Sequence, residues 1–350
     1  MNTRISSREW QAHERAFRRR VFPHASTADW RDWRWQMANR LQTKEAVAHS
    51  LALSGRERAA LASPHRWRMP LAITPYYAAL LELEPPDGPL RRTVLPDERE
   101  GTHGAGEQMD PLGEEAHQAT AHVVRSYPHK ALLLVTTECA CFCRYCTRAR
   151  RARRGTPTDL APALAFLRAE SGIQDVLISG GDPLVLGNEV LGDLLQQLRD
   201  IPHVDFLRLG SKVPAVLPQR ITHELPRLFK RFRPLWISTH FTHPMELTPP
   251  VAKACARLSE AGIPLMNQTV LLRGINDTAE TLRELNEGLL RIGVKPYYLH
   301  QGDMAAGTAH LRSSIRRGRC ILKALCGNTT GYAIPHFMLD QPGGGGKIPL

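Results

Sequence analysis

The strongest constraint on the fold is a regular alternation of strand-like and helix-like segments that starts near residue 131. The predicted strands are 131–137, 175–179, 206–211, 235–240, 264–270, 295–301 and 332–339, and the predicted helices lie near 158–170, 188–199, 223–231, 248–261 and 277–292. Strands that alternate with helices in this way form βα units and a parallel sheet. About six such units predict an α/β protein with a partial or full β/α barrel. No GxGxxG follows the first strand to favour a doubly wound sheet.

The rest of the chain divides into a region before the barrel and a short segment after it. Residues 1–85 have apolar residues at helical spacing, with several tryptophans in DWRDWRWQMANRL, and they predict a helical region. Residues 86–118 are rich in Pro, Gly and acidic residues, which predicts a loop or arm over the surface. We therefore expect an N-terminal helical region and arm at 1–118, a barrel at 119–330 and a C-terminal segment at 331–350.

Composition narrows the class of protein. A chain of 350 residues can bury a sizeable core, and its 42% hydrophobic content is that of a folded globular protein. The N-terminus lacks the apolar stretch of a secretory signal, and the longest apolar runs have the length of strands, so we expect a cytoplasmic protein without membrane spans. The formal charge of +12 is spread along the chain and accompanies no known nucleic-acid module, so nucleic acid is not the expected partner.

Polar and glycine-rich segments follow the predicted strands at their C-terminal ends. They read SGGDPL at 179–184, GSKVP at 210–214, STHFTHP at 238–244 and YYLHQGDM at 297–304. Because active sites of β/α barrels are built at the C-terminal ends of the strands, these segments predict an enzyme.

Four cysteines crowd the loop after the first predicted strand, in TTECACFCRYCTRAR. A zinc or disulfide staple, a nucleic-acid-binding knuckle and an iron–sulfur cluster are competing explanations. Structural zinc takes four ligands, and the chain has no second CxxC to complete them. Cys139, Cys143 and Cys146, spaced C-x3-C-x2-C, supply three thiolates and would leave one iron of a [4Fe–4S] cluster open. Cys141 lies inside the loop and is interpreted as a bystander.

This spacing, with Tyr145 before the last cysteine, resembles the signature of radical S-adenosylmethionine enzymes, and SGGDPL resembles their glycine-rich segment. The resemblance then narrows to the lysine 2,3-aminomutase family. It rests on CRYCTRAR, DVLISGGDPL, IPHVDFLRLGSKVPAVLPQRIT, THFTHP, NQTVLLRGIND, VKPYYLHQGDM and LDQPGGGGKIP, with DWRDWRWQ and DPLGEE nearer the N-terminus. These segments extend from about residue 8 to the C-terminus.

The resemblance implies three cofactors and a radical reaction. A [4Fe–4S] cluster would reduce S-adenosyl-L-methionine, and the resulting 5′-deoxyadenosyl radical would abstract hydrogen from C3 of an amino acid held as an imine of pyridoxal 5′-phosphate. The resemblance assigns the cluster to Cys139, Cys143 and Cys146; S-adenosylmethionine to Tyr145, Gly180, Gly181, Asp182, His240 and Gln268; pyridoxal phosphate to Lys347, Tyr127 and Lys130, with Lys347 also the catalytic lysine; and the substrate to Arg148, Asp303 and Asp340.

The charges of the implied pocket indicate the substrate. Arg148 would bind the carboxylate, and Asp303 and Asp340 would bind a side-chain ammonium, so the expected reaction converts L-α-lysine to L-β-lysine. Paired acids disfavour a glutamate aminomutase. An arginine aminomutase stays open, because a guanidinium also pairs with carboxylates. A radical enzyme acting on a translation factor or tRNA is the other alternative.

The chain departs from the family pattern in places. Ser126 stands where the family usually has a phosphate-binding arginine, and Arg125 is the residue that could shift in to compensate. Thr278 replaces a usual cysteine, and the sequence stops at Leu350, before the zinc-binding segment of many members. We therefore expect a homo-oligomer without the interfacial zinc of the family, and a flavodoxin- or ferredoxin-like reductant as partner.

Overall fold

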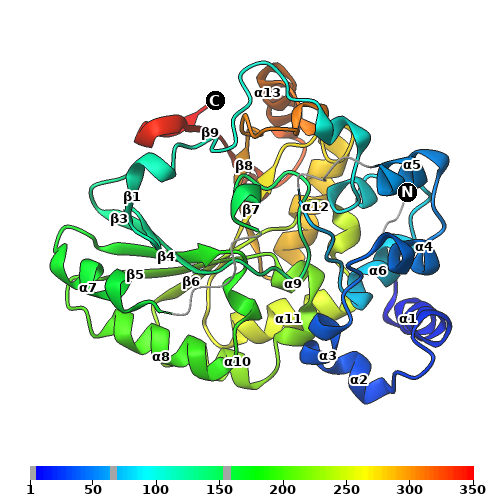
Figure 1. The fold of residues 1–350 in the computed structure, drawn as a ribbon, viewed down its shortest axis with the longest axis horizontal. Coiled ribbons are helices and arrows are strands. Elements are labelled where there is room, and N and C mark those ends of the chain that lie inside the picture. The colour runs from blue at the N-terminus through cyan, green and yellow to red at the C-terminus, as the bar shows by residue number, and fades with distance from the viewer. Residues whose placement is uncertain (1–4, 64–68, 153–158) are drawn as a thin grey trace.

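The protein is an α/β structure built on one ten-stranded sheet. The computed structural model describes residues 5–63, 69–152 and 159–350. The strands follow one another in sequence order across the sheet, and the first and last strands are not paired with each other, so the sheet stays open (Figure 1). The strands are β1 (Gln118–Thr120), β2 (Val123–Val124), β3 (Lys130–Thr136), β4 (Asp175–Gly180), β5 (Phe206–Ser211), β6 (Leu235–Thr239), β7 (Leu265–Val270), β8 (Lys295–His300), β9 (His336–Gln341) and β10 (Gly346–Pro349).

The central strands β3 to β9 are parallel, and each pairs with the next in the chain. Short antiparallel strands extend the sheet, with β1 and β2 before β3 and with β10 after β9. This arrangement confirms the predicted partial barrel.

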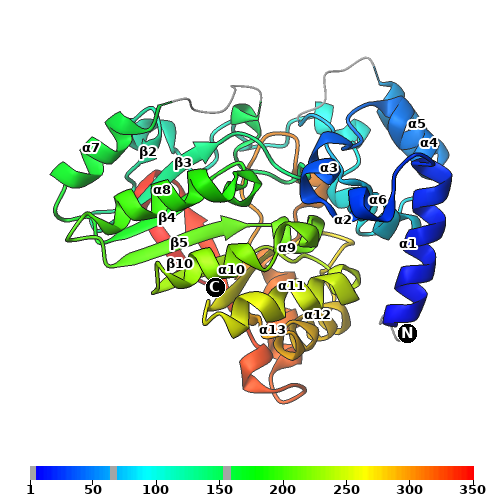
Figure 2. The same ribbon diagram turned by 90° about the horizontal axis from the view of Figure 1, so that it is seen from below.

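Helices that connect the parallel strands lie along the outer side of the sheet (Figures 1 and 2). They are α7 (Ala161–Ala169), α8 (Asn188–Arg199), α9 (Val213–Val216), α10 (Glu224–Lys230), α11 (Pro249–Glu260), α12 (Ala279–Arg291) and α13 (Ile315–Leu325). Their apolar stripes explain this packing. For example, α12 buries Leu282, Leu285 and Leu289 at the spacing of one helical face.

The N-terminal region forms a layer of helices beside the barrel, and in Figure 2 the arrow of β5 points toward it. These helices are α1 (Ser7–Val21), α2 (Thr27–Arg31), α3 (Trp33–Ala38), α4 (Lys44–Ser50), α5 (Gly55–Ala62) and α6 (Pro75–Glu82). Residues of α1 and α6, such as Trp10 and Tyr77, belong to the same hydrophobic cluster as barrel residues such as Phe337. The proposed division into three parts stays a prediction.

Two expectations from the sequence need correction. Residues 86–118 do not simply cover the surface, because Leu90, Arg91 and Glu114 are buried. The last parallel strand begins at His336, whereas the sequence predicted residue 332; residues Gly331–Ala333 form a 3-10 turn before it. The first residue of the helix predicted at 158–170 lies outside the described residues. Among the described residues, no helix is both long enough and apolar enough to cross a membrane.

Candidate active site

A cavity of about 430 Å³ opens at the C-terminal ends of the parallel strands. Because side chains alternate between the two faces of a strand, residues two apart line the same wall. Lys130 and Leu132 line the cavity from β3, and Tyr298 and His300 line it from β8. All the residues that the sequence assigned to cofactors and substrate line this cavity: Tyr127, Lys130, Cys139, Cys143, Tyr145, Cys146, Arg148, Gly180, Gly181, Asp182, His240, Gln268, Asp303, Asp340 and Lys347.

The cysteine loop is fixed in place by the N-terminal region. Arg144, between two of the predicted ligands, is 1% exposed and pairs with the buried Glu100. The Arg144 guanidinium also donates to the Met69 carbonyl at 2.8 Å. Arg40 donates to the carbonyl oxygen of Cys139 at 2.7 Å. The helical layer therefore orients the loop that presents the thiols.

The three predicted cluster thiols, Cys139, Cys143 and Cys146, all line the cavity. Burial raises the pKa of the Cys143 thiol to about 11, although the nearby Lys212 charge opposes this rise. Burial and the charges of Asp182 and the other cysteines also hold the pKa of Cys139 well above its usual value. Such thiols resist ionisation without a bound cation, and iron supplies that charge. The residues therefore fit a cluster.

The described residues can also be compared with the geometry of a site for a single metal ion. Within residues 5–63, 69–152 and 159–350, no three His, Cys, Asp or Glu side chains converge closely enough to hold one metal ion. An iron–sulfur cluster has several iron atoms, so its thiolates need not converge on one point.

Cys141 also lines the cavity, but it differs from the other three cysteines in its apolar packing. It is 3% exposed and belongs to the main hydrophobic cluster. Its sulfur accepts a hydrogen bond from the backbone N–H of Thr74 at 3.4 Å. These contacts favour the interpretation of Cys141 as a structural residue.

The glycines after β4 allow a close backbone approach to the cysteine loop. A side chain at Gly181 would place its Cβ 2.1 Å from the Glu138 carbonyl oxygen, and Gly180 has a φ of +122°. The Asp182 carboxylate accepts hydrogen bonds from Ser211 Oγ at 2.7 Å and from the backbone of Leu184, Lys212 and Val213. A carboxylate has about four acceptor positions, so this set leaves it little capacity for a cofactor. Asp182 therefore joins β4 to the end of β5.

A buried polar chain leads from the cysteine loop to Glu246. The Tyr145 hydroxyl lies 2.8 Å from His240 Nε2 and 3.0 Å from Thr242 Oγ1. The Lys212 ammonium donates to Thr242 Oγ1 at 3.3 Å and to Glu246 at 2.7 Å. Burial and the Lys212 charge hold the pKa of His240 well below its usual value, so its ring is neutral at pH 7.

Lys347 is held by the strand pair that carries it. Antiparallel pairing of β9 and β10 puts Lys347 directly opposite Asp340, and its ammonium lies 2.6 Å from both carboxylate oxygens. The ammonium also lies 5.6 Å from the centre of the Tyr298 ring. His300 Nδ1 is 3.5 Å from Asp340, and His300 Nε2 is 3.2 Å from Gln268 Oε1. Lys347 is therefore anchored inside the cavity.

Two further cations, Lys130 of β3 and Arg208 of β5, line the cavity. The Lys130 ammonium lies 3.8 Å from the centre of the Tyr127 ring. Arg125 does not replace the missing arginine at position 126, because its guanidinium pairs with Glu170 at 2.6 Å and it does not line the cavity. Arg208 of β5 does line the cavity, and its guanidinium pairs with Asp175 at 2.8 Å. Tyr127, Lys130 and Lys347 fit a phosphate-bearing aldehyde cofactor, which needs an amine and cations.

Arg148, Asp303 and Asp340 also line the cavity. Arg148 pairs with Glu114 at 2.7 Å, and its Nη1 lies 3.4 Å from Ser179 Oγ. Burial and the nearby Asp340 charge raise the pKa of Asp303 to about 7. The cavity therefore has a cation for a carboxylate and two acids for a cation.

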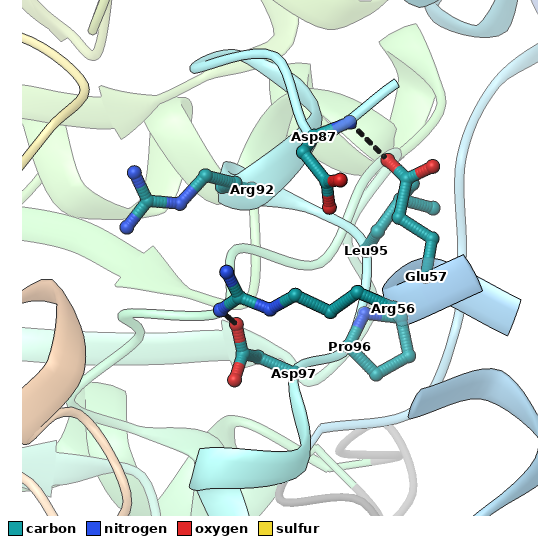
Figure 3. A pocket seen from close by; sticks show the side chains of 7 residues that line it. All are labelled: Arg56, Glu57, Asp87, Arg92, Leu95, Pro96 and Asp97. Atoms are coloured by element: carbon teal, nitrogen blue, oxygen red, sulfur yellow. Dashed lines mark hydrogen bonds and ion pairs between the residues drawn. The ribbon is translucent and has the colours of Figure 1, made fainter. Parts of the chain in front are cut away.

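A second, smaller pocket lies at α5 (Figure 3). Its lining residues are Arg56, Glu57, Asp87, Arg92, Leu95, Pro96 and Asp97. Its volume of about 20 Å³ admits a water molecule, not an amino acid. Arg56 pairs with Asp97 across it, so its charges are structural.

Sequence reasoning missed three charged residues of the cavity: Glu114, Arg208 and Lys212. The alternation of β5 could have found Arg208, because Arg208 and Gly210 share one face of that strand. Nothing in the sequence pairs Glu114 with Arg148, 34 residues later.

The chain is similar to known proteins over most of its length. A family model described as lysine-2,3-aminomutase matches residues 322–350. The L-lysine 2,3-aminomutase of Clostridium subterminale is 41% identical over 336 residues, which cover 94% of this chain and 80% of that protein. The glutamate 2,3-aminomutase of Clostridioides difficile is 38% identical over 92% of this chain and 77% of its own length. A radical SAM methyltransferase structure from Sphaerobacter thermophilus has a TM-score of 0.44 and 16% identity, covering 62% of this chain and 68% of that chain.

The relatives are isomerases that move an amino group, and this chain is an enzyme of that class. The chain belongs to the lysine 2,3-aminomutase family.

Proposed function

We propose that this enzyme converts L-α-lysine to L-β-lysine by a 1,2-amino shift. The observation that carries the proposal is one cavity with Arg148 for the carboxylate, Asp303 and Asp340 for the side-chain ammonium, and Lys347 on β10, just after the glycine turn that follows β9. Curated relatives with about 40% identity are named L-lysine 2,3-aminomutases. Two acids would repel the side-chain carboxylate of glutamate, the substrate in the name of another relative.

Three cofactors complete the proposed site: a [4Fe–4S] cluster on Cys139, Cys143 and Cys146, S-adenosyl-L-methionine, and pyridoxal 5′-phosphate. When bound, the cluster and S-adenosylmethionine supply a hydrogen-abstracting radical, and pyridoxal phosphate carries the migrating nitrogen. The thiolates hold the iron, and the neutral His240 and Tyr145 form the cavity wall beside the cluster loop.

The other residues of the chain position the substrate. Lys347 holds pyridoxal phosphate through its amine between turnovers, and Tyr127 and Lys130 form the phosphate end. In the structure the Lys347 ammonium forms an ion pair with the Asp340 carboxylate. Asp340 would accept the side-chain ammonium of a lysine substrate only in a state in which Lys347 has moved off it.

A reducing compartment and a protein reductant fit this chemistry. All seven cysteines are free thiols in the structure. We propose a cytoplasmic enzyme that receives its electron from a flavodoxin- or ferredoxin-like protein. The homo-oligomer stays a prediction.

The test is an anaerobic assay of the reconstituted enzyme. Dithionite, S-adenosylmethionine and pyridoxal phosphate are added with an equimolar mixture of lysine, arginine and glutamate, and mass spectrometry identifies isomers. β-Lysine is the expected product. A β-isomer of arginine alone would assign the arginine reaction, and cleavage of S-adenosylmethionine without any isomer would point to a macromolecular substrate.

Asp340→Asn should weaken lysine binding more than it affects the cofactors. The substitution removes a charge from the ammonium end, where a charged hydrogen bond contributes about 2 kcal/mol, so we expect KM for lysine to rise about 30-fold. Steady-state kinetics measure KM. The controls are the iron content and the cleavage of S-adenosylmethionine with dithionite as reductant and no amino acid present. An unchanged KM would remove Asp340 from the substrate site.

Lysine binding should strengthen as pH rises through neutrality. The pKa of Asp303 is raised to about 7 by burial and by Asp340, against the charges of Lys347, Arg312 and Arg148. Below this pKa the carboxyl is neutral and cannot pair with ammonium, so KM should be about tenfold higher at pH 6 than at pH 8. The pH profile of KM measures this, and Asp303→Asn should flatten it. A profile that keeps its slope in Asp303→Asn would assign the titration to another group.

A further inference from the structure

We propose that Glu114 is a positioning residue that fixes the orientation of the Arg148 guanidinium, so that Arg148 presents only one edge to the substrate carboxylate. The inference rests on the proposed function, because it takes Arg148 as the carboxylate-binding residue.

The contacts of Arg148 separate the two edges of its guanidinium. Nε donates to Glu114 Oε1 at 2.8 Å, and Nη2 lies 2.7 Å from the same oxygen. Nη1 lies 3.4 Å from Ser179 Oγ, at the cavity wall. A guanidinium can bind a carboxylate through its Nε–Nη2 edge or through its Nη1–Nη2 edge. Glu114 occupies the first edge, so the second is left for the substrate.

Glu114 is itself held from several sides. Its side chain is 6% exposed, and Arg150 lies 3.2 Å from its second carboxylate oxygen. Arg150 also pairs with Asp110 at 2.7 Å. We call residues 110–115 the strap. Arg150 therefore neutralises charge within the strap. The position of the Glu114 carboxylate does not depend on Arg148 alone.

The strap also contacts the turn that carries Lys347. The Gly343 N–H donates to the Leu112 carbonyl at 3.2 Å. In the same turn Gly344, with a φ of +80°, would place a Cβ 2.6 Å from the Ser126 carbonyl oxygen. One segment thus touches both the carboxylate-binding arginine and the glycine turn. Misplacing this segment would change the distance between the carboxylate and the migrating nitrogen.

A competing interpretation is that Glu114 is a plug, a carboxylate that occupies the place of the substrate until it is displaced. The contacts with Arg150 and through Leu112 favour a fixed strap. The two interpretations predict different kinetics. Removal of a plug lowers KM and leaves kcat unchanged, whereas removal of a positioning residue lowers kcat, because small misplacements of a reactant cost up to about 100-fold in rate.

The experiment compares Glu114→Ala, Glu114→Gln and the matched control Glu115→Ala in the reconstituted holoenzyme. Glu115 is the next residue of the strap, its side chain is 47% exposed, and it pairs with Arg150 at 3.1 Å. We expect Glu114→Ala to lower kcat about 30- to 100-fold with a smaller change in KM. Glu114→Gln keeps an oxygen that accepts from Arg148, so it should restore kcat to within about fivefold of wild type. Glu115→Ala should stay within about twofold.

Two activity-independent readouts accompany the kinetics: iron content and the visible absorption of pyridoxal phosphate, which also reports lysine binding in a titration. A Glu114→Ala enzyme with wild-type kcat and a lower KM would overturn the proposal in favour of the plug. If Glu114→Ala does not fold, Glu114→Gln decides alone: a lower KM supports the plug, and near-wild-type kcat and KM support positioning. A wild-type enzyme without any amino shift would instead refute the proposed function.

Discussion

Replacing Cys143 with alanine is expected to abolish both the amino shift and the cleavage of S-adenosylmethionine. Cys143 supplies one of three predicted thiolates, and removing one leaves an iron atom without its protein ligand. Replacing a residue that only supports a metal ligand lowers metal affinity or activity roughly 10- to 100-fold. Loss of a ligand itself should therefore lower activity by more than that. The measurement is formation of 5′-deoxyadenosine under dithionite, together with iron and sulfide content and the visible spectrum.

Cys141→Ala is the matched control for this experiment. Cys141 lies in the same loop, but its sulfur contacts Thr74 and the apolar core. We expect the Cys141→Ala enzyme to keep its iron and its S-adenosylmethionine cleavage activity. The smaller side chain should lower its thermal stability somewhat. Cleavage that persists in Cys143→Ala, or that disappears only in Cys141→Ala, would contradict the assigned ligand set.

Replacing Lys347 with alanine should abolish the amino shift and leave the cluster intact. The amine of Lys347 is the group proposed to bind pyridoxal phosphate covalently, and no other lysine side chain among the described residues pairs with Asp340. We therefore expect loss of the visible absorption of lysine-bound cofactor, with turnover falling by at least about 1000-fold. Iron content and reductive cleavage of S-adenosylmethionine should stay at wild-type levels.

Lys130→Ala provides the comparison for Lys347→Ala. Lys130 lies at the phosphate end beside Tyr127 and carries no proposed covalent role. Its loss should weaken pyridoxal phosphate binding, and excess cofactor should restore turnover. Excess cofactor should not restore Lys347→Ala. Equal recovery of both variants would mean that another lysine carries the cofactor.

The sheet and most of its helices could be predicted because their signals are local. Strand β5 and helix α8 begin and end where the sequence predicted, since alternating and helical apolar patterns are read within one segment. The segment 86–118, predicted as an arm over the surface, lies there only in part. Its Pro and Gly content correctly indicated irregular backbone, but composition does not reveal that Leu90 and Arg91 are buried under other elements.

The site shows the same division. The residues that line the cavity could be named in advance, but their partners could not. Arg125, next to the substituted Ser126, pairs with Glu170 outside the cavity, whereas Arg208 lines the cavity from the middle strand β5. Strand pairing places Leu132, Leu177 and Arg208 side by side, and this register depends on the assembled sheet.

By itself, the sequence determined the order of βα units, the thiol spacing and the chemical groups available for catalysis. Only the tertiary structure decided which charges meet: Arg148 with Glu114, Lys347 with Asp340, and Lys212 with Glu246. The physical reason is range. Backbone preferences and apolar periodicity act over a few residues, whereas an ion pair depends on the distance between two side chains, which packing of the whole chain sets.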